Sequence, residues 1–284
     1  MGLGPSSFFV VGNNSTILYF NGSTWANISS RGSEDLWDVW GTNTSDVFVV
    51  GDNGTALLYN GTVWKDISLG NLEDLSGVWC NSSTDAFAVG YNNSLGWSTN
   101  STIWRYDGDT WTEMDWPRWP GAFYSHLLKD IWGSDSSNVY AVGYQWFWDV
   151  HLGENLEVHY DGSNWSQLSP GLWIEQLWGV WGNSPSEVFA VGAFDYTDPF
   201  SSSAITYQWS SMPNHGTAYL RGVWGTSSSD VFAVGKNREW GVGEGKDHSI
   251  LHYNGSAWSN MSSGTTEALW GGLRQQLLKR VRCW

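Results

Sequence analysis

The chain has 284 residues and a formal net charge of −15 at pH 7. Nucleic acids and anionic membrane surfaces attract proteins with basic patches, so this charge argues against both classes of partner. The sequence shows no apolar signal segment and no apolar stretch long enough for a transmembrane helix. Its length suits one domain with a large core.

A short sequence motif recurs along the chain and contains the first predicted strands. We call this motif the phrase, and the glycine that ends it the phrase glycine. Val39-Trp40-Gly41 is followed by the apolar run 47–50 and then by Gly51, and a truncated copy of the phrase opens the chain at 8–12. Self-similarity at a spacing of about 40–50 residues is typical of propellers and other repeat folds. The repeat units centre on Gly12, Gly51, Gly90, Gly143, Gly192 and Gly235.

Each complete unit contains four short predicted strands. In the second unit they span 36–40, 47–50, 56–59 and 63–67, which are apolar or aromatic runs. Asn60-Gly61 between the last two is a hairpin signal, because both residues tolerate a positive φ. We therefore predict an all-β fold, a β-propeller of about six four-stranded antiparallel blades within residues 1–272. A truncated seven- or eight-bladed propeller is the alternative.

The end of each unit carries a family resemblance. Tyr59-Asn60-Gly61 and Trp64 follow an apolar strand, and the preceding strand ends in a glycine. This pattern resembles the kelch-type propeller repeat, although the kelch double glycine is a single glycine here, as in Val142-Gly143. It is also similar to the Asp-box of sialidase-like propellers, but the Asp-x-Gly spacing is missing. The resemblance implies a propeller fold and transfers no catalytic residue.

Insertions occur in the connections that follow the second strand of a unit and, at 115–121, in the connection that follows the fourth strand of the third unit. The interval from the first-strand tryptophan to the phrase glycine is constant, as from Trp40 to Gly51. The interval from the phrase glycine to the next aromatic residue is 8 residues from Gly51 to Tyr59 but 17 from Gly143 to Tyr160. In an antiparallel blade these connections share one face. We therefore expect an insertion face over units three to six that binds a partner.

The 23 tryptophans divide into periodic and non-periodic groups. The periodic ones predict packing between blades. The non-periodic aromatic residues lie in the insertions, where an exposed cluster would bind a ligand and a buried one would form a satellite core. The predicted ligand-binding set of the insertion face is Trp97, Trp116, Trp119, Trp146, Trp148, Asp149, Phe194, Tyr196 and Trp240.

Unrepeated acidic residues in the insertions could hold Ca²⁺ through oxygen ligands, or could be solvated charge. The metal candidates are Asp195, Asp198, Glu244 and Asp247. No spacing singles out a pair of catalytic carboxylates, a zinc site or a nucleophile. We therefore predict no catalytic residue and no cofactor other than this candidate Ca²⁺.

Asn-x-Ser/Thr sequons are dense along the chain. They are typical of glycosylated secreted or cell-surface proteins, although turns also favour Asn, Gly, Ser and Thr. Asp107 and Asp161 occupy the turn position that Asn60 holds in its own unit, which fits the second explanation. The predicted glycosylation sites are Asn21, Asn60, Asn81, Asn100, Asn164 and Asn254.

Both ends of the sequence depart from the repeat. The first unit lacks a first strand, which Leu269-Trp270 could supply to close the ring. Residues 273–284 hold four of the 13 basic residues and no acid. We interpret them as an out-of-frame or non-native tail; a genuine short basic tail is the alternative.

Together these patterns favour a non-catalytic binding propeller that is extracellular or at the cell surface. It would contact a glycan or a protein through the insertion face. A structural surface or filament protein is the first alternative, and a glycoside-active enzyme is the second.

Overall fold

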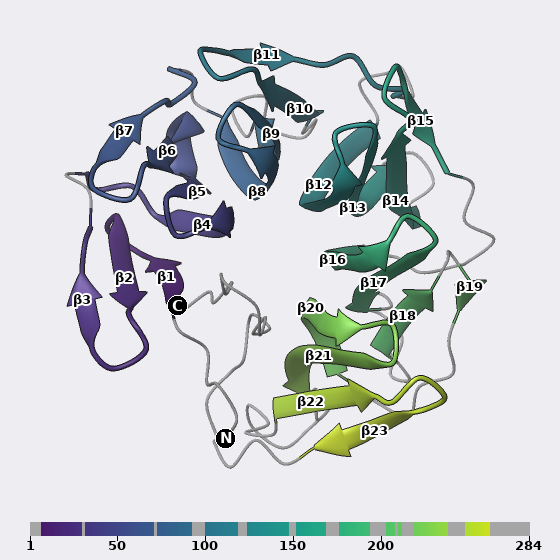
Figure 1. Cartoon of the computed structure of the whole chain (residues 1–284). Coiled ribbons are helices and arrows are strands. Elements are labelled where there is room, and N and C mark those ends of the chain that lie inside the picture. The colour runs from purple at the N-terminus through teal and green to yellow at the C-terminus, as the bar shows by residue number, and fades with distance from the viewer. Residues whose placement is uncertain are drawn as a thin grey trace.

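The computed structural model of the chain shows sheets arranged around a common centre (Figure 1). All sheets are antiparallel meanders whose neighbouring strands are consecutive in sequence. The residues described are 7–29, 32–70, 73–92, 100–118, 124–147, 152–168, 176–193, 203–207, 210–211, 218–237 and 248–261.

Within this part of the chain, five sheets have four strands and the first has three. Sheet 1 contains β1 (Phe8–Gly12), β2 (Thr16–Phe20) and β3 (Trp25–Asn27). Sheet 2 contains β4 (Leu36–Asn43), β5 (Asp46–Gly51), β6 (Ala56–Tyr59) and β7 (Trp64–Asp66), with the short 3-10 turn η1 (Asp52–Gly54) before β6. Sheet 3 contains β8 (Asp74–Ser82), β9 (Asp85–Asn92), β10 (Asn100–Tyr106) and β11 (Trp111–Glu113).

The remaining three sheets follow the same order. Sheet 4 contains β12 (Tyr124–Asp135), β13 (Asn138–Phe147), β14 (Leu152–Tyr160) and β15 (Trp165–Gln167). Sheet 5 contains β16 (Gln176–Ser184), β17 (Glu187–Ala193), β18 (Ser203–Tyr207) and β19 (Ser210–Ser211). Sheet 6 contains β20 (Ala218–Ser227), β21 (Asp230–Asn237), β22 (His248–Tyr253) and β23 (Trp258–Met261).

The predicted all-β antiparallel fold is confirmed, and β6 has the predicted bounds. Five four-stranded blades are complete within the described residues and sheet 1 has three strands there, so a ring of six complete blades stays a prediction. The strand expected from Leu269-Trp270 and the proposed tail 273–284 both lie outside the described residues.

The repeated aromatic residues pack between consecutive sheets, as the sequence predicts. The ring centroid of Phe87 in sheet 3 lies 5.8 Å from that of Tyr160 and 6.4 Å from that of Trp165 in sheet 4. Burying such rings against each other supplies much of the stability of a propeller core. The same contact joins Phe9 to Tyr59 and Trp64, Phe48 to Tyr106 and Trp111, and Phe189 to Tyr253 and Trp258.

The glycine that ends each phrase permits a β-bulge in the facing inner strand. In sheet 4, Leu128 pairs with Gly143 and Asp130 pairs with Val142, so Lys129 is the extra residue. A Cβ atom on Gly143 would lie 1.9 Å from a backbone carbonyl oxygen, so only glycine fits. Because a bulge re-aims its side chain, this position can differ between sheets without disturbing the ladder. The residues at this bulge in sheets 2 to 6, which we call the bulge residues, are Trp37, Ser76, Lys129, Trp178 and Arg221.

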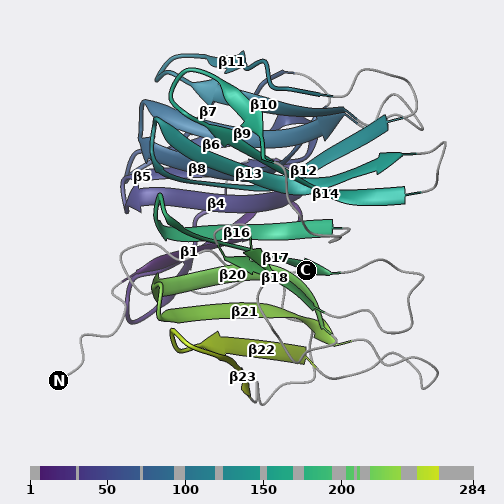
Figure 2. The same cartoon turned by 90° about the vertical axis from the view of Figure 1, so that its right-hand side faces the viewer.

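In sheets 2, 3, 4 and 6 the tight turns share one face. A Cβ atom on Gly108, in the outer hairpin of sheet 3, would lie 2.9 Å from Thr84 in the inner hairpin, and Gly61 and Ser45 are related in the same way in sheet 2. We call this side the turn face. The strands of sheet 4 extend farthest toward the opposite side, the predicted insertion face (Figure 2).

Candidate functional site

Two basic and three aromatic side chains gather at the inner strands of sheets 3 to 6. The Lys129 ammonium nitrogen lies 4.3 Å from the ring centroid of Tyr91, 5.3 Å from that of Trp178 and 5.8 Å from that of Tyr144. The Arg221 guanidinium carbon lies 3.7 Å from the centroid of Trp178. We call these five residues the cation–aromatic arc.

The repeat explains why these residues meet. Lys129, Trp178 and Arg221 are the bulge residues of three consecutive inner strands. Tyr91 and Tyr144 each follow a phrase glycine, at the point where the second strand leads into the inserted connection. The arc therefore lies at the inner edge of the ring, toward the insertion face.

The chemistry of the arc combines flat apolar faces with positive charge. A cation over an aromatic ring is attracted by the ring quadrupole with about 0.5–2 kcal/mol. A guanidinium stacked on a ring keeps its in-plane N–H donors directed sideways, where they can meet a carboxylate. Burial raises the pKa of Tyr144, with the Arg221 charge acting in the opposite direction, so its hydroxyl stays protonated near pH 7.

Sheets 2 and 3, with the segment that leads into sheet 2, place negative charge at the equivalent level of the ring. The indole N–H of Trp37, the bulge residue of sheet 2, donates to the Asp52 carboxylate. Burial raises the pKa of Asp52, the Trp37 hydrogen bond lowers it, and Asp74, Asp35 and Glu34 raise it further by charge repulsion. We call Glu34, Asp35, Asp52 and Asp74 the acidic edge.

Backbone N–H donors organise the acidic edge. The backbone N–H of Asn53 donates to Asp74 at 3.2 Å, and that of Asn14 donates to Asp35 at 2.9 Å. These hydrogen bonds hold carboxylates of neighbouring sheets in fixed positions. The inner edge of the ring is thus acidic over sheets 2 and 3, whereas the two cations of the arc come from sheets 4 and 6.

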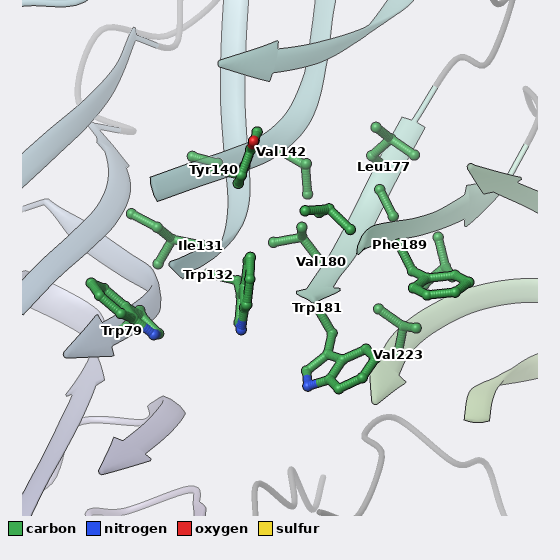
Figure 3. Packing of buried hydrophobic residues seen from close by; sticks show 14 of the residues in the cluster. Trp79, Ile131, Trp132, Tyr140, Val142, Leu177, Val180, Trp181, Phe189 and Val223 are labelled. Carbon is green, nitrogen blue, oxygen red and sulfur yellow. The ribbon is translucent and has the colours of Figure 1, made fainter. Parts of the chain in front are cut away.

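A second feature lies on the turn face. A hollow of about 640 Å³ is lined by Trp40, Trp79 and Trp132 together with polar residues of the inner hairpins. Trp79, Trp132 and Trp181 come from the inner strands β8, β12 and β16 of three consecutive sheets, and Figure 3 shows them one after another. The polar lining residues are Thr42, Asn81, Ser134, Asp135, Asn183 and Ser184.

The stacking of these tryptophans depends on glycine in the next sheet. A Cβ atom on Gly182 would lie 2.5 Å from the ring of Trp132, so glycine makes room for that ring. In sheet 3 the equivalent residue is Cys80, which is buried and joins the same cluster as Trp40. Trp40 is only half-buried, whereas Trp132 is 4% exposed, as expected if a side chain occupies the space that glycine leaves elsewhere.

Two of the predicted binding residues lie within the described residues with side chains placed. Trp116 was expected to be an exposed anchor, but it is 6% exposed and packs edge-on against His126, with ring centroids 5.7 Å apart. It is therefore buried, in the same hydrophobic cluster as the inner-strand residues Trp132 and Trp181. Trp146 is half-buried on β13. Trp97, Trp119, Trp148, Asp149, Phe194, Tyr196 and Trp240 lie outside the described residues.

The metal candidates Asp195, Asp198, Glu244 and Asp247 also lie outside the described residues, and the described ones contain no group of three or more His, Cys, Asp or Glu that could hold a metal ion. Among the predicted glycosylation sites, Asn100 is half-buried. The exposed sites are Asn21, Asn60, Asn81, Asn164 and Asn254.

Sequence reasoning missed the cation–aromatic arc because it looked for function in the insertions. A signal was present: the residue three positions before the first-strand tryptophan varies from Ser76 to Lys129 to Arg221, although its neighbours repeat. Its spatial consequence follows only from the bulge and from the order of the sheets.

No protein family model and no curated protein matches the sequence. Solved structures with a similar fold include YCF48 bound to D1 peptide, with 13% identity, a TM-score of 0.55 and coverage of 94% of this chain and 86% of that one. YCF48 from Cyanidioschyzon merolae has 14% identity and a TM-score of 0.56, with coverage of 94% of this chain and 88% of that one. The WD40 β-propeller domain of Doa1 has 6% identity and a TM-score of 0.61, with coverage of 94% of this chain and 85% of that one.

Identities this low establish the fold alone, so the chain is a β-propeller protein. No helix in the described part of the chain has the length and apolarity needed to cross a membrane.

Proposed function

We propose that this propeller is a non-catalytic binding protein that takes an extended segment of a protein partner at the cation–aromatic arc. The observation that carries the proposal is the placement of Lys129 and Arg221 around the ring of Trp178. Trp, Tyr and Arg side chains are enriched among residues that contribute most to protein binding. Here all three types occur at repeat positions whose residue type varies from sheet to sheet.

The comparison with YCF48 supports a peptide as the ligand class, because that propeller is described in complex with the D1 peptide. A peptide offers carbonyl oxygens and carboxylates to the cations and apolar side chains to the aromatic faces. An arc spread over several sheets suits an extended ligand better than a compact one.

The proposal includes a setting outside the cell or at its surface, which the exposed sequons at Asn21, Asn81 and Asn164 favour. Mass spectrometry of the protein secreted from a glycosylating host tests it. Glycans on these residues are expected, and unmodified residues in a secreted protein would contradict it.

We also propose that the kelch-like repeat forms a closed six-bladed ring. Trp25 is 52% exposed in sheet 1, whereas its equivalents Trp165 and Trp258 pack against the preceding sheet. Closure would give Trp25 such a neighbour. Trp25→Ala and Trp165→Ala should then both lower the midpoint of thermal unfolding, and no effect of Trp25→Ala would contradict closure.

A glycan is the second candidate ligand, favoured by the hollow on the turn face. The half-buried ring of Trp40, together with polar groups such as Asn183 and Asp135, is the kind of lining that recognises sugars, and the hollow of about 640 Å³ falls in the size range of ligand sites. This site lies on the face opposite the cation–aromatic arc, so the two candidates can be separated by mutation.

The test is parallel screening of the recombinant chain on a random peptide array and a glycan array, beside Trp178→Ala. Val63→Ala serves as the control, because it removes an exposed apolar side chain from the outer hairpin of sheet 2. Peptide binding that Trp178→Ala loses and Val63→Ala keeps supports the proposal. Glycan binding that Trp178→Ala keeps favours the hollow, and no binding by the folded chain favours a structural protein.

A further inference from the structure

We propose that the cation–aromatic arc recognises a carboxylate of the bound peptide, an inference that rests on the proposed peptide-binding function. The relevant carboxylate is either the C-terminal one or that of an Asp or Glu side chain. Both present the same two oxygens, and the arc provides the charge and the donors for them.

Arg221 supplies the donor fork. Its guanidinium carbon lies 3.7 Å from the ring centroid of Trp178, within the distance of direct stacking. Stacking fixes the plane of the guanidinium, so less conformational entropy is lost when it binds a planar carboxylate with two parallel hydrogen bonds. A lysine in the same place could not offer this geometry.

Lys129 supplies a second positive charge near Trp178, from the preceding sheet. Its ammonium group lies 5.3 Å from the centroid of Trp178 and 4.3 Å from that of Tyr91. The aromatic rings exclude water from one side of both cations, which strengthens their attraction for an anion. The Tyr144 ring, whose centroid is 5.9 Å from that of Trp178, extends this apolar wall.

The negative charge around the cation–aromatic arc favours a ligand with one carboxylate over a polyanion. The chain carries −15 overall, and Asp52 and Asp74 of the acidic edge lie at the equivalent level of sheets 2 and 3. A polyanion that extended from the arc along the ring would meet these carboxylates, and like charges at an interface oppose binding. We therefore expect a preference for one carboxylate over a run of them.

The experiment uses the peptides selected on the random peptide array. Each is synthesised with a free C-terminal acid, as the C-terminal amide, and with every internal Asp and Glu changed to Asn and Gln. Dissociation constants are measured by calorimetry for wild type, Arg221→Gln and Lys129→Gln. Lys65→Gln, on the outer strand β7, is the matched control, and polyglutamate is the polyanion probe.

The proposal predicts that Arg221→Gln binds the acid-bearing peptide roughly 10- to 100-fold more weakly, as for a lost hydrogen bond to a charged group. Loss of the peptide carboxylate should weaken wild type similarly and Arg221→Gln little further. The amide arm and the Asn/Gln arm identify which carboxylate is read. Lys65→Gln should bind like wild type, and polyglutamate should bind poorly.

Two results would overturn the inference. One would overturn carboxylate recognition alone, and the other would also overturn the proposed peptide binding. Peptides that bind equally well without any carboxylate, and equally to wild type and to both arc variants, would overturn carboxylate recognition and leave peptide binding intact. A chain that is folded by circular dichroism but binds no peptide would overturn the proposed function and this inference together.

Discussion

The carboxylate of Asp130 accepts a hydrogen bond from the backbone N–H of Val180 at 2.9 Å, across the boundary between sheets 4 and 5. Its other oxygen accepts from the N–H of Ile131 at 2.8 Å. Asp38 reaches Val78 at 2.8 Å in the same way, which joins sheet 2 to sheet 3. These buried carboxylates connect the inner strands that carry the bulge residues.

Replacing Asp130 by Ala should destabilise the fold by about 3 kcal/mol, because two buried N–H groups lose a charged acceptor. The stability of Asp130→Asn should lie between those of wild type and Asp130→Ala, since the amide keeps one oxygen acceptor. Urea unfolding followed by circular dichroism measures the change. The exposed Asp109→Ala is the control and should differ little from wild type. An Asp130→Ala protein as stable as wild type would contradict the role of this contact.

Glu157 occupies a position that is aliphatic in other sheets. It pairs with Val142, whereas Ile103 pairs with Val89 and Ile250 with Val234 at the equivalent places. Burial raises the pKa of Glu157 from 4.5 to about 7, and a hydrogen bond from Asn155 opposes the shift. The folded chain therefore keeps this group protonated at pH values where the unfolded chain ionises it.

The stability contributed by protonated Glu157 is complete below about pH 4.5 and is lost as pH rises to about 7. The loss amounts to about 3 kcal/mol. Urea unfolding near pH 5 and near pH 8 should show this fall for wild type and a smaller one for Glu157→Gln. Glu157→Ile should exceed wild type in stability near pH 8. Equal pH dependence of wild type and Glu157→Gln would rule out the assignment.

Cys80 should be inert in the folded chain. It is buried, and burial raises the pKa of its thiol. The negative charge of Asp46 raises this pKa by a smaller amount, so little thiolate is present. In a Cys283→Ser background, iodoacetamide should modify folded Cys80 at least about 100-fold more slowly than the urea-unfolded chain. Modification at equal rates in both states would show that the thiol is accessible.

The fold could be predicted from the sequence because the same pattern of strands and turns recurs in several units. The hairpin turn at Asn60-Gly61, the glycine at Gly51 and the strand 56–59 all agree with the same four-stranded unit. The role of Gly51 as the partner of a bulge was not visible, because it depends on the backbone of the facing strand. A Cβ atom on Gly51 would lie 2.2 Å from the carbonyl oxygen of Asp35, a contact that only the folded chain reveals.

The candidate site was harder to predict because its residues come from separate units. Tyr91, Lys129, Trp178 and Arg221 are far apart in sequence and meet only through the order of the sheets. Trp116 shows the opposite case, since a non-periodic aromatic residue in a connection looks exposed until a neighbour such as His126 covers it. Periodicity identifies the core well, but it cannot separate a binding surface from a satellite core.

The most direct test of peptide binding at the inner edge is hydrogen–deuterium exchange of the whole chain with and without a saturating array-selected peptide. We predict new protection in 124–131, 176–180 and 218–223, where the bulges of β12, β16 and β20 carry Lys129, Trp178 and Arg221. Protection confined to 79–84, 132–137 and 181–187 would place the ligand at the hollow on the turn face and would contradict peptide binding at the arc.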